Sequence, residues 1–401
     1  MDDTTRTQPN TPPRPSPKAK KKPSFLRRVI LALVALAMIL SAVAAVAFRD
    51  RLNLDSIKRW FTYRALILSD SGQADAFSYG GTIADTFAVL DSDLLVCSSN
   101  NLSLYSGSGT RYVDETVNLA NPVVATNGTL AVVYDAGGSE LHVVGERELI
   151  YSSRTEDPIL AAHLNRSGQL TVVTQPNSYR GSVTVYNSAY EKIMSVNLSS
   201  AFVMDAALSD NGSTLAILTI GQRSGSFSST LAYYTVDTTA DDGAYTPQHT
   251  VELGRNVILG LRHREDQVWA LGDLGLSLIS HTGALSTLDW SDKYLKLYDL
   301  GGDGFAVALL GTYRAGSQAT LCAVDAAGNS SVLPVNEQIL SLSAAGRYFA
   351  VLTADRLDIY TSDMALYRTL EGTQGARKAL LMEDGSAILL SADSASYYVP
   401  Q

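Results

Sequence analysis

Apolar and polar positions alternate in short runs over most of this chain, from about Ala74 to the C-terminus. The recurring unit is an apolar strand, a tight polar turn and a second apolar strand, and it is clearest in FVMDAALSDNGSTLAILTI (202–220). Short runs bounded by turn residues are typical of β-strands, and the turns favour glycine or Asx because a two-residue hairpin requires positive φ. The pattern therefore predicts an all-β domain made of repeated hairpins.

Eight of these turns can be marked along the chain, and neighbouring markers lie 35 to 54 residues apart. The markers are Asp93, Gly128, Gly168, Gly212, Asp266, Gly304, Gly346 and Gly385. Repeats of about 40 residues with β rather than helical texture are typical of propeller blades, which have four strands each. We expect an eight-bladed β-propeller, with seven blades as the alternative.

The third and fourth strands of the repeats can also be recognised. Third strands are expected at 102–107, 182–187, 276–281, 320–325 and 357–362, and a polar fourth strand at 192–198. The last unit ends in SASYYVPQ after only three strands, and residues 74–81 could supply its fourth strand, which would leave no free edge. The longest interval contains TVDTTADDGAYTPQHT, which we interpret as an extended loop.

The N-terminal region has a different character. Residues 29–48, from Val29 to Phe48, contain no charged side chain, and a helix of that length spans about 30 Å, the thickness of the hydrocarbon core of a bilayer. Residues 1–28 are proline-rich and carry eight Lys or Arg against two Asp. A basic flank of this kind stays on the cytoplasmic side. The alternative is a cleaved signal peptide, because Ala45-Val46-Ala47 fits a cleavage site.

These features predict four segments: a disordered basic cytoplasmic tail (1–28), one transmembrane α-helix (29–48), a juxtamembrane helix or linker (49–73) and the propeller (74–401). In the third segment, Leu54, Ile57 and Phe61 recur at helical spacing with Trp60 beside them. This spacing predicts a short helix with aromatic residues at the membrane interface. A plain stalk is the alternative.

Several stretches together resemble a known family. They are FAVLDSDLLVCSSNNLSLYSGSG (87–109), LAVVYDAGG (130–138), QPNSYRGSVTVYNS (175–188) and AALSDNGSTLAILTI (206–220), in this order after an apolar span. The chain is similar to the membrane-anchored propeller family catalogued as domain of unknown function 5711, over nearly all of the sequence after the tail. More generally, its turns resemble those of WD-like and quinoprotein-like repeats. The resemblance implies an architecture and no functional residue.

Motifs for chemistry are absent from the sequence. There is no Walker A, G-x-S-x-G or dinucleotide-binding fingerprint, and the five histidines (His142, His163, His249, His263, His281) lack the spacing of paired metal ligands. Asp237, Asp241, Asp242 and Asp303 fit solvated turns better than a calcium loop. We expect no catalytic residue, cofactor or metal site. Cys97 and Cys322 lie in apolar runs and are predicted to be buried free thiols.

Tyr179 and Arg180 lie between the expected second and third strands of one blade, and we expect them to form part of a binding rim. The chain has a formal charge of −9, with its excess of basic residues confined to the tail, so nucleic acid is not an expected partner.

Together these features predict a single-pass plasma-membrane protein with a cytoplasmic N-terminus and an extracytoplasmic propeller. The propeller is expected to be a non-enzymatic binding or scaffolding module for another cell-envelope protein or a wall glycan. A propeller hydrolase or lyase is the alternative, and carboxylates and histidines gathered at one mouth of the channel would favour it. A transmembrane sensor is a third hypothesis.

Overall fold

The computed structural model describes residues 34, 54–223, 225–237 and 245–400. The chain divides into two compact units, Met1–Leu54 and Asp55–Gln401, and the strands belong to the second. Among the described residues, no helix is both long enough and apolar enough to cross a bilayer. The predicted tail (1–28) and transmembrane span (29–48) lie outside the described residues apart from Val34.

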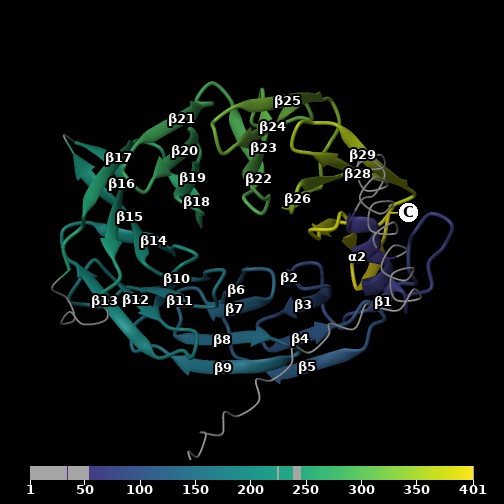
Figure 1. Cartoon of the computed structure of the whole chain (residues 1–401), viewed down its shortest axis with the longest axis horizontal. Helices are drawn as coiled ribbons and strands as arrows, with labels where there is room; N and C mark the ends of the chain where they lie inside the picture. The colour runs from purple at the N-terminus through teal and green to yellow at the C-terminus, as the bar shows by residue number, and fades with distance from the viewer. Residues whose placement is uncertain (1–33, 35–53, 224, 238–244, 401) are drawn as a thin grey trace, which may run out of the picture. The chain divides into compact units, whose positions relative to one another are not determined.

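The strands form eight four-stranded antiparallel sheets arranged as blades around a central axis (Figure 1). The predicted eight-bladed β-propeller is confirmed, and the seven-bladed alternative is wrong. Seven blades follow each other along the chain: blade 1 (β2–β5), blade 2 (β6–β9), blade 3 (β10–β13), blade 4 (β14–β17), blade 5 (β18–β21), blade 6 (β22–β25) and blade 7 (β26–β29). Blade 8 combines β30, β31 and β32 with β1.

Each blade has an innermost strand beside the central axis and an outermost strand at the periphery. The innermost strands are β2 (Thr86–Leu90), β6 (Pro122–Thr126), β10 (Ile159–Leu164), β14 (Phe202–Leu208), β18 (Ile258–Arg264), β22 (Tyr294–Asp299), β26 (Ser341–Ala345) and β30 (Lys378–Leu381). The second strands are β3 (Asp93–Cys97), β7 (Leu130–Asp135), β11 (Leu170–Thr174), β15 (Thr214–Arg223), β19 (Gln267–Gly272), β23 (Phe305–Gly311), β27 (Tyr348–Leu352) and β31 (Ala387–Leu390). The third strands are β4 (Asn101–Tyr105), β8 (Glu140–Gly145), β12 (Gly181–Tyr186), β16 (Ser226–Thr235), β20 (Gly275–Ser280), β24 (Ala319–Asp325), β28 (Arg356–Thr361) and β32 (Ser394–Tyr398). The outermost strands are β5 (Arg111–Thr116), β9 (Glu148–Arg154), β13 (Lys192–Leu198), β17 (His249–Gly254), β21 (Leu285–Asp289), β25 (Ser330–Val335), β29 (Leu366–Glu371) and β1 (Phe77–Ser78).

The ring closes as the sequence predicts. Phe77 and Ser78 of β1 pair with Ala395 and Ser394 of β32, so residues from the start of the propeller complete its last blade. Tyr79 follows β1 and is almost fully buried. Its hydroxyl donates to the carbonyl oxygens of Ser391 and Ala392, at 3.0 Å each. This arrangement leaves blade 8 with the same number of strands as the others.

The hydrophobic core lies between neighbouring blades. Eight apolar clusters each join two adjacent blades, and the cluster between blades 8 and 1 also includes Tyr63 of the helix. Second strands such as β3 and β27 are buried along their whole length, whereas the outermost strand β9 alternates between exposed and half-buried residues. Strands covered on both faces therefore appear in the sequence as continuous apolar runs.

The turns between first and second strands differ in part from the expectation. Six of the eight marker residues are glycines with positive φ, as predicted, but in blades 1 and 5 the positive-φ residues are Asp91 and Glu265 rather than the markers Asp93 and Asp266. Several turns are also longer than two residues, as between Leu208 and Leu215. Longer turns still need a left-handed residue to reverse the chain, so glycine remains a useful marker.

The propeller has two different faces. Because neighbouring strands are antiparallel, the turns that follow the first and third strands of every blade emerge on one side, which we call the hairpin face. The turns that follow the second strands, and the connections from one blade to the next, emerge on the other side, which we call the crossover face.

The helix α2 (Leu54–Tyr63) packs against the hairpin face of blades 7 and 8 (Figure 1). Arg59 is buried and donates to the carbonyl oxygen of Asp384 and, at 3.1 Å, to the hydroxyl of Tyr367. Asp55 accepts hydrogen bonds from Arg347 at 2.7 Å and from the Tyr348 hydroxyl at 2.8 Å. The predicted short helix is present, and it is docked on the propeller rather than forming a free stalk.

Candidate functional site

Blades 3 to 6 differ from the others in their innermost strands. The strands β10, β14, β18 and β22 each shift register by one residue against the second strand of their blade, whereas β2, β6, β26 and β30 pair without a shift. The extra residues are Leu160, Met204, Leu259 and Lys296. A bulge re-aims the side chains that follow it and is common beside functional sites. The bulged strands of blades 3 to 6 are therefore candidates for the functional site.

Exposed apolar side chains gather at the crossover-face end of these strands. We call Tyr179, Arg180, Phe202, Met204, Leu259 and Tyr294 the aromatic rim. Its apolar members are between 43% and 51% exposed although they lie at or beside the starts of core strands. A large apolar side chain left in solvent beside several others marks an interaction surface more often than a structural need.

Tyr179 and Arg180 lie in the turn between β11 and β12, where the sequence placed them. The Arg180 guanidinium lies 4.6 Å from the ring centroid of Phe202, and its Nε donates to the carbonyl oxygen of Ser199 at 3.1 Å. The next residue, Gly181, packs so closely on Val203 that an added Cβ would lie 2.5 Å from the Val203 Cβ. The absence of a side chain at Gly181 thus lets the Tyr179–Arg180 turn lie directly against β14.

A projecting hairpin extends the same face. In blade 4, the pairing of β15 with β16 continues for three residue pairs beyond the point where β14 begins, at Phe202 opposite Ile220. Phe227 lies near the tip of this two-stranded ribbon and is 72% exposed. The ribbon places a further aromatic side chain on the crossover face of the bulged half.

Charged groups follow further along the bulged strands. We call His163, Asp205, Arg262, Arg264 and Asp299 the polar arc. His163 Nε2 lies 2.7 Å from Asp205 Oδ1, which ties blade 3 to blade 4. Burial tends to lower the pKa of His163, but the neighbouring Asp205 carboxylate outweighs it and raises that pKa above its ordinary value.

The two arginines of the arc have unequal partners. Burial lowers the pKa of Arg262 to about 10, and its guanidinium reaches the carbonyl oxygen of Leu300 at 3.4 Å. Arg264 pairs with Asp303 at 3.2 Å. Asp303 is an exposed turn residue, as expected, and its carboxylate also carries this salt bridge.

Asp299 links blades 6 and 7. Its carboxylate accepts the backbone N–H of Gly301 at 2.6 Å and that of Ala344 at 3.0 Å, and burial raises its pKa. Sequence reasoning missed the polar arc because its members come from four separate repeats. The run LGLRHRED (259–266), with two arginines inside an otherwise apolar strand, was the one local signal.

Sequence comparison identifies the family. Residues 77–287 match the sequence family described as "Family of unknown function (DUF5711)". The chain belongs to this family. The match includes the aromatic-rim residues up to Leu259 and most of the polar arc. A search of curated proteins finds no match to the sequence.

Solved structures share the fold of this DUF5711 protein at low identity. The C-terminal WD40 domain of Sif2 aligns with a TM-score of 0.54 at 13% identity, covering 80% of this chain and 98% of that one. Apo AztD from Citrobacter koseri aligns with a TM-score of 0.52 at 11% identity, covering 80% and 97%. Hydrazine synthase from Kuenenia stuttgartiensis aligns with a lower TM-score of 0.45 at 11% identity, covering 83% of this chain and 97% of that one. At these identities the likeness concerns the propeller fold alone.

A set with the membership of a hydrolase triad lies on blade 2. His142 Nδ1 is 2.9 Å from the Ser152 hydroxyl, and His142 Nε2 is 2.9 Å from the Glu140 carboxylate. His142 is the third residue of its blade's third strand and lies opposite Ser152 of the outermost strand. Other blades also pair polar residues at this position: Ser103 with Asp114, Ser277 with Thr287 and Asp358 with Thr369. We therefore interpret Glu140, His142 and Ser152 as a structural hydrogen-bonded group that links two strands.

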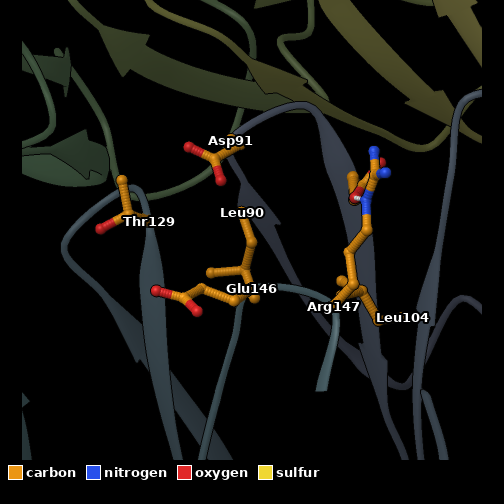
Figure 2. A pocket seen from close by; sticks show the side chains of 7 residues that line it. Leu90, Asp91, Leu104, Thr129, Glu146 and Arg147 are labelled. Carbon is orange, nitrogen blue, oxygen red and sulfur yellow. Dashed lines mark hydrogen bonds and ion pairs between the residues drawn. The ribbon is translucent and has the colours of Figure 1, made fainter. Parts of the chain in front are cut away.

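Two small cavities lie at blade boundaries outside the bulged half. The first, about 190 Å³, is on the hairpin face between blades 1 and 2, and Figure 2 shows Asp91, Thr129 and Glu146 around it. Arg147, also in its wall, already pairs with Asp93 at 2.8 Å. The second, about 290 Å³, has a mostly polar lining between blades 8 and 1. Both are smaller than the roughly 300–1,000 Å³ of drug-sized ligand pockets.

The histidines and cysteines singled out in the sequence can be placed in the structure. Within the residues that the structure describes, no group of three or more His, Cys, Asp or Glu side chains is placed to hold a metal ion. Cys97 and Cys322 are both free and buried, as predicted. Burial raises the pKa of Cys97 to about 12 and also raises that of Cys322, so neither is an activated thiolate.

Proposed function

We propose that this DUF5711 protein is a non-enzymatic binding or scaffolding module of the cell envelope. Its apolar segment Val29–Phe48 anchors it in the plasma membrane with the N-terminus in the cytoplasm. The propeller lies outside the cytoplasm and presents its aromatic rim to another envelope protein or a wall glycan. The charge-free segment of the sequence supports the membrane anchor, and the exposed rim of blades 3 to 6 supports the binding role.

The observation that carries the binding role is the composition and exposure of the aromatic rim. Aromatic residues, methionine and arginine are enriched in the cores of protein interfaces, and a few such residues dominate the binding energy. Tyrosine and phenylalanine faces also suit the apolar faces of sugar rings. The two cavities described above, of about 190 and 290 Å³, lie below or at the lower end of the roughly 300–1,000 Å³ of small-molecule pockets. A surface partner therefore fits the molecule better.

The test compares two variants of the full-length protein in crosslinked membranes. Phe202→Ser removes the ring on which Arg180 stacks. Val332→Ser changes another exposed apolar residue, on the outermost strand of blade 6, and serves as the control. We expect a partner that is recovered with wild type and with Val332→Ser and is reduced at least tenfold with Phe202→Ser. Equal recovery of every partner with both variants would remove the rim from the proposal.

A hydrolase or lyase is the second candidate function, and the polar arc favours it. His163 and Asp205 form an ion pair across blades 3 and 4, and two arginines, which can neutralise an acidic sugar, lie on the innermost strand of the next blade. Wild type and Asp205→Asn would be incubated with neutral and uronic-acid wall glycans, and the products followed by mass spectrometry. Glycan cleavage by wild type that Asp205→Asn abolishes would establish an enzyme. No product from any glycan leaves the binding role as the better account.

A further inference from the structure

The helix α2 buries a charged side chain against the propeller and exposes large apolar side chains, which is the opposite of a usual surface helix in water. Arg59 is only 4% exposed and Tyr63 6%, because both face the propeller. Trp60 is 64% exposed and Phe61 61%. A surface helix in water normally turns its apolar stripe toward the core and its charges toward solvent. Here the polar contacts of Asp55 and Arg59 and the buried ring of Tyr63 hold the helix in place. Trp60 and Phe61 point outward.

The outward side chains form one patch. Ile57, Trp60 and Phe61 lie at helical spacing on the side away from the propeller, and the rings of Trp60 and Phe61 meet edge to face at 4.8 Å. Ile67, just beyond the helix, is 82% exposed. We call these four residues the interfacial face. Exposed apolar residues on one side of a helix and directly after it in the chain mark a surface that interacts with another protein or with a membrane.

We propose that the interfacial face inserts into the headgroup region of the bilayer and sets the orientation of the propeller. The inference rests on the membrane anchoring in the proposed function. The charge-free segment ends at Phe48, six residues before Leu54. Six residues span at most about 20 Å, so an anchored chain must keep α2 close to the bilayer surface.

The chemistry of the neighbouring residues fits lipid better than a protein partner. In the sequence, Arg49 and Arg51 precede the helix and Arg64 follows it, so basic residues stand before and after the apolar positions of this segment. Tryptophan prefers the headgroup region, where its ring is in a mixed environment. A helix with aromatic residues on one face and nearby cations that attract anionic lipids is typical of an interfacial helix.

The proposal has a consequence for the binding site. Since α2 is docked on the hairpin face of blades 7 and 8 through Arg59 and Asp55, that part of the hairpin face is turned toward the bilayer. The crossover face, with its aromatic rim, then points away from the membrane. This orientation leaves the rim open to an envelope protein or wall glycan.

The test uses the tryptophan fluorescence of the full-length chain. The protein has three tryptophans, of which Trp269 and Trp290 are buried in the propeller at 3% and 2% exposure and Trp60 is exposed. Purified full-length protein would be reconstituted into phosphatidylcholine–phosphatidylglycerol vesicles, with or without brominated acyl chains, and floated on a density gradient. Bromine quenches tryptophan on contact. We expect brominated vesicles to quench part of the wild-type emission and none of the emission of Trp60→Phe.

Three other outcomes would contradict the inference, and each points to a different environment of Trp60. Protein that floats with the vesicles but is quenched by soluble acrylamide instead of brominated lipid would place Trp60 in water. Floating protein quenched by neither reagent would show that a protein surface covers Trp60. Protein that does not float would overturn the membrane anchor of the proposed function, and this inference with it.

A second variant tests the orientation. Phe227 is 72% exposed on the crossover face, so Phe227→Trp in the Trp60→Phe background moves the reporter to the opposite side of the ring. We expect acrylamide to quench the new tryptophan and brominated lipid to leave it unchanged. Quenching of this reporter by brominated lipid would contradict the proposed orientation.

Discussion

Single residues in unexpected surroundings distinguish blades 3 to 6. Met204 and Leu259 are apolar and exposed, whereas Arg262 and Arg264 are charged and lie in a mostly apolar strand. Each of these exceptions follows or accompanies a bulge. The bulge changes which side of the strand a residue faces, because side chains alternate with a period of two. The bulges therefore account for the exposure of Met204 and Leu259 and for the side of the strand on which the charged residues after them lie.

The His163–Asp205 pair predicts a specific pH dependence of stability. Asp205 raises the folded-state pKa of His163 above the unfolded value of about 6.5. The stabilisation by the pair is therefore complete below about pH 6.5 and is lost as the pH rises through the folded-state pKa. The difference in unfolding free energy between wild type and His163→Gln should shrink with increasing pH in urea titrations. Asp205→Asn should remove this dependence, and a difference that stays constant with pH would contradict the prediction.

At the scale of elements, the sequence locates the strands well and their contacts poorly. The predicted fourth strand 192–198 coincides with β13, and the predicted third strands at 182–187 and 320–325 differ by one residue from β12 or β24 at one or both ends. Alternation and turn residues are local signals, so they survive in a single sequence. The register shifts of β10, β14, β18 and β22 cannot be recognised in the sequence, because a bulge adds one residue to a strand without changing its composition.

The docking of α2 depends on Arg59. In Arg59→Ala the carbonyl oxygen of Asp384 and the hydroxyl of Tyr367 lose a donor, and a buried unsatisfied group costs about 1–3 kcal/mol. We expect faster hydrogen exchange in residues 54–63, measured by mass spectrometry, and unchanged exchange in blades 3 to 6. Lys58→Ala is the control, since Lys58 and Glu383 are both exposed and their pair contributes little. Equal exchange in the two variants would refute a role for Arg59.

At the scale of the whole molecule, closure of the ring depends on a very short strand. Phe77 and Ser78 of β1 pair with β32, and Gln73 adds an antiparallel bridge to Tyr398 beyond the named strand. Phe77 packs near Tyr105 and Tyr397 with ring centroids 5.9 and 6.4 Å apart, which joins blade 8 to blade 1. The closure thus combines backbone pairing with aromatic packing between blades 8 and 1.

Tyr79 should accordingly be critical for stability. Truncating a large buried aromatic side chain costs roughly 3–5 kcal/mol, and Tyr79→Ala also removes the donor to Ser391 and Ala392. Tyr79→Phe keeps the ring and should lose only about 1 kcal/mol. Urea denaturation of both variants would measure these costs. Tyr313→Ala, at an exposed position, should change stability by less than about 0.5 kcal/mol. A Tyr79→Ala cost no larger than that of Tyr313→Ala would disprove the prediction.

The sequence by itself determined the number of blades, the closure by residues from both ends of the ring and the position of Tyr179 and Arg180 in a turn. These properties follow from strand alternation, turn chemistry and repeat length, which act over a few residues. The tertiary structure alone decided that His163 meets Asp205, that four innermost strands are bulged and that Arg59 rather than Trp60 faces the propeller. Those outcomes depend on segments up to 325 residues apart, which only packing brings together.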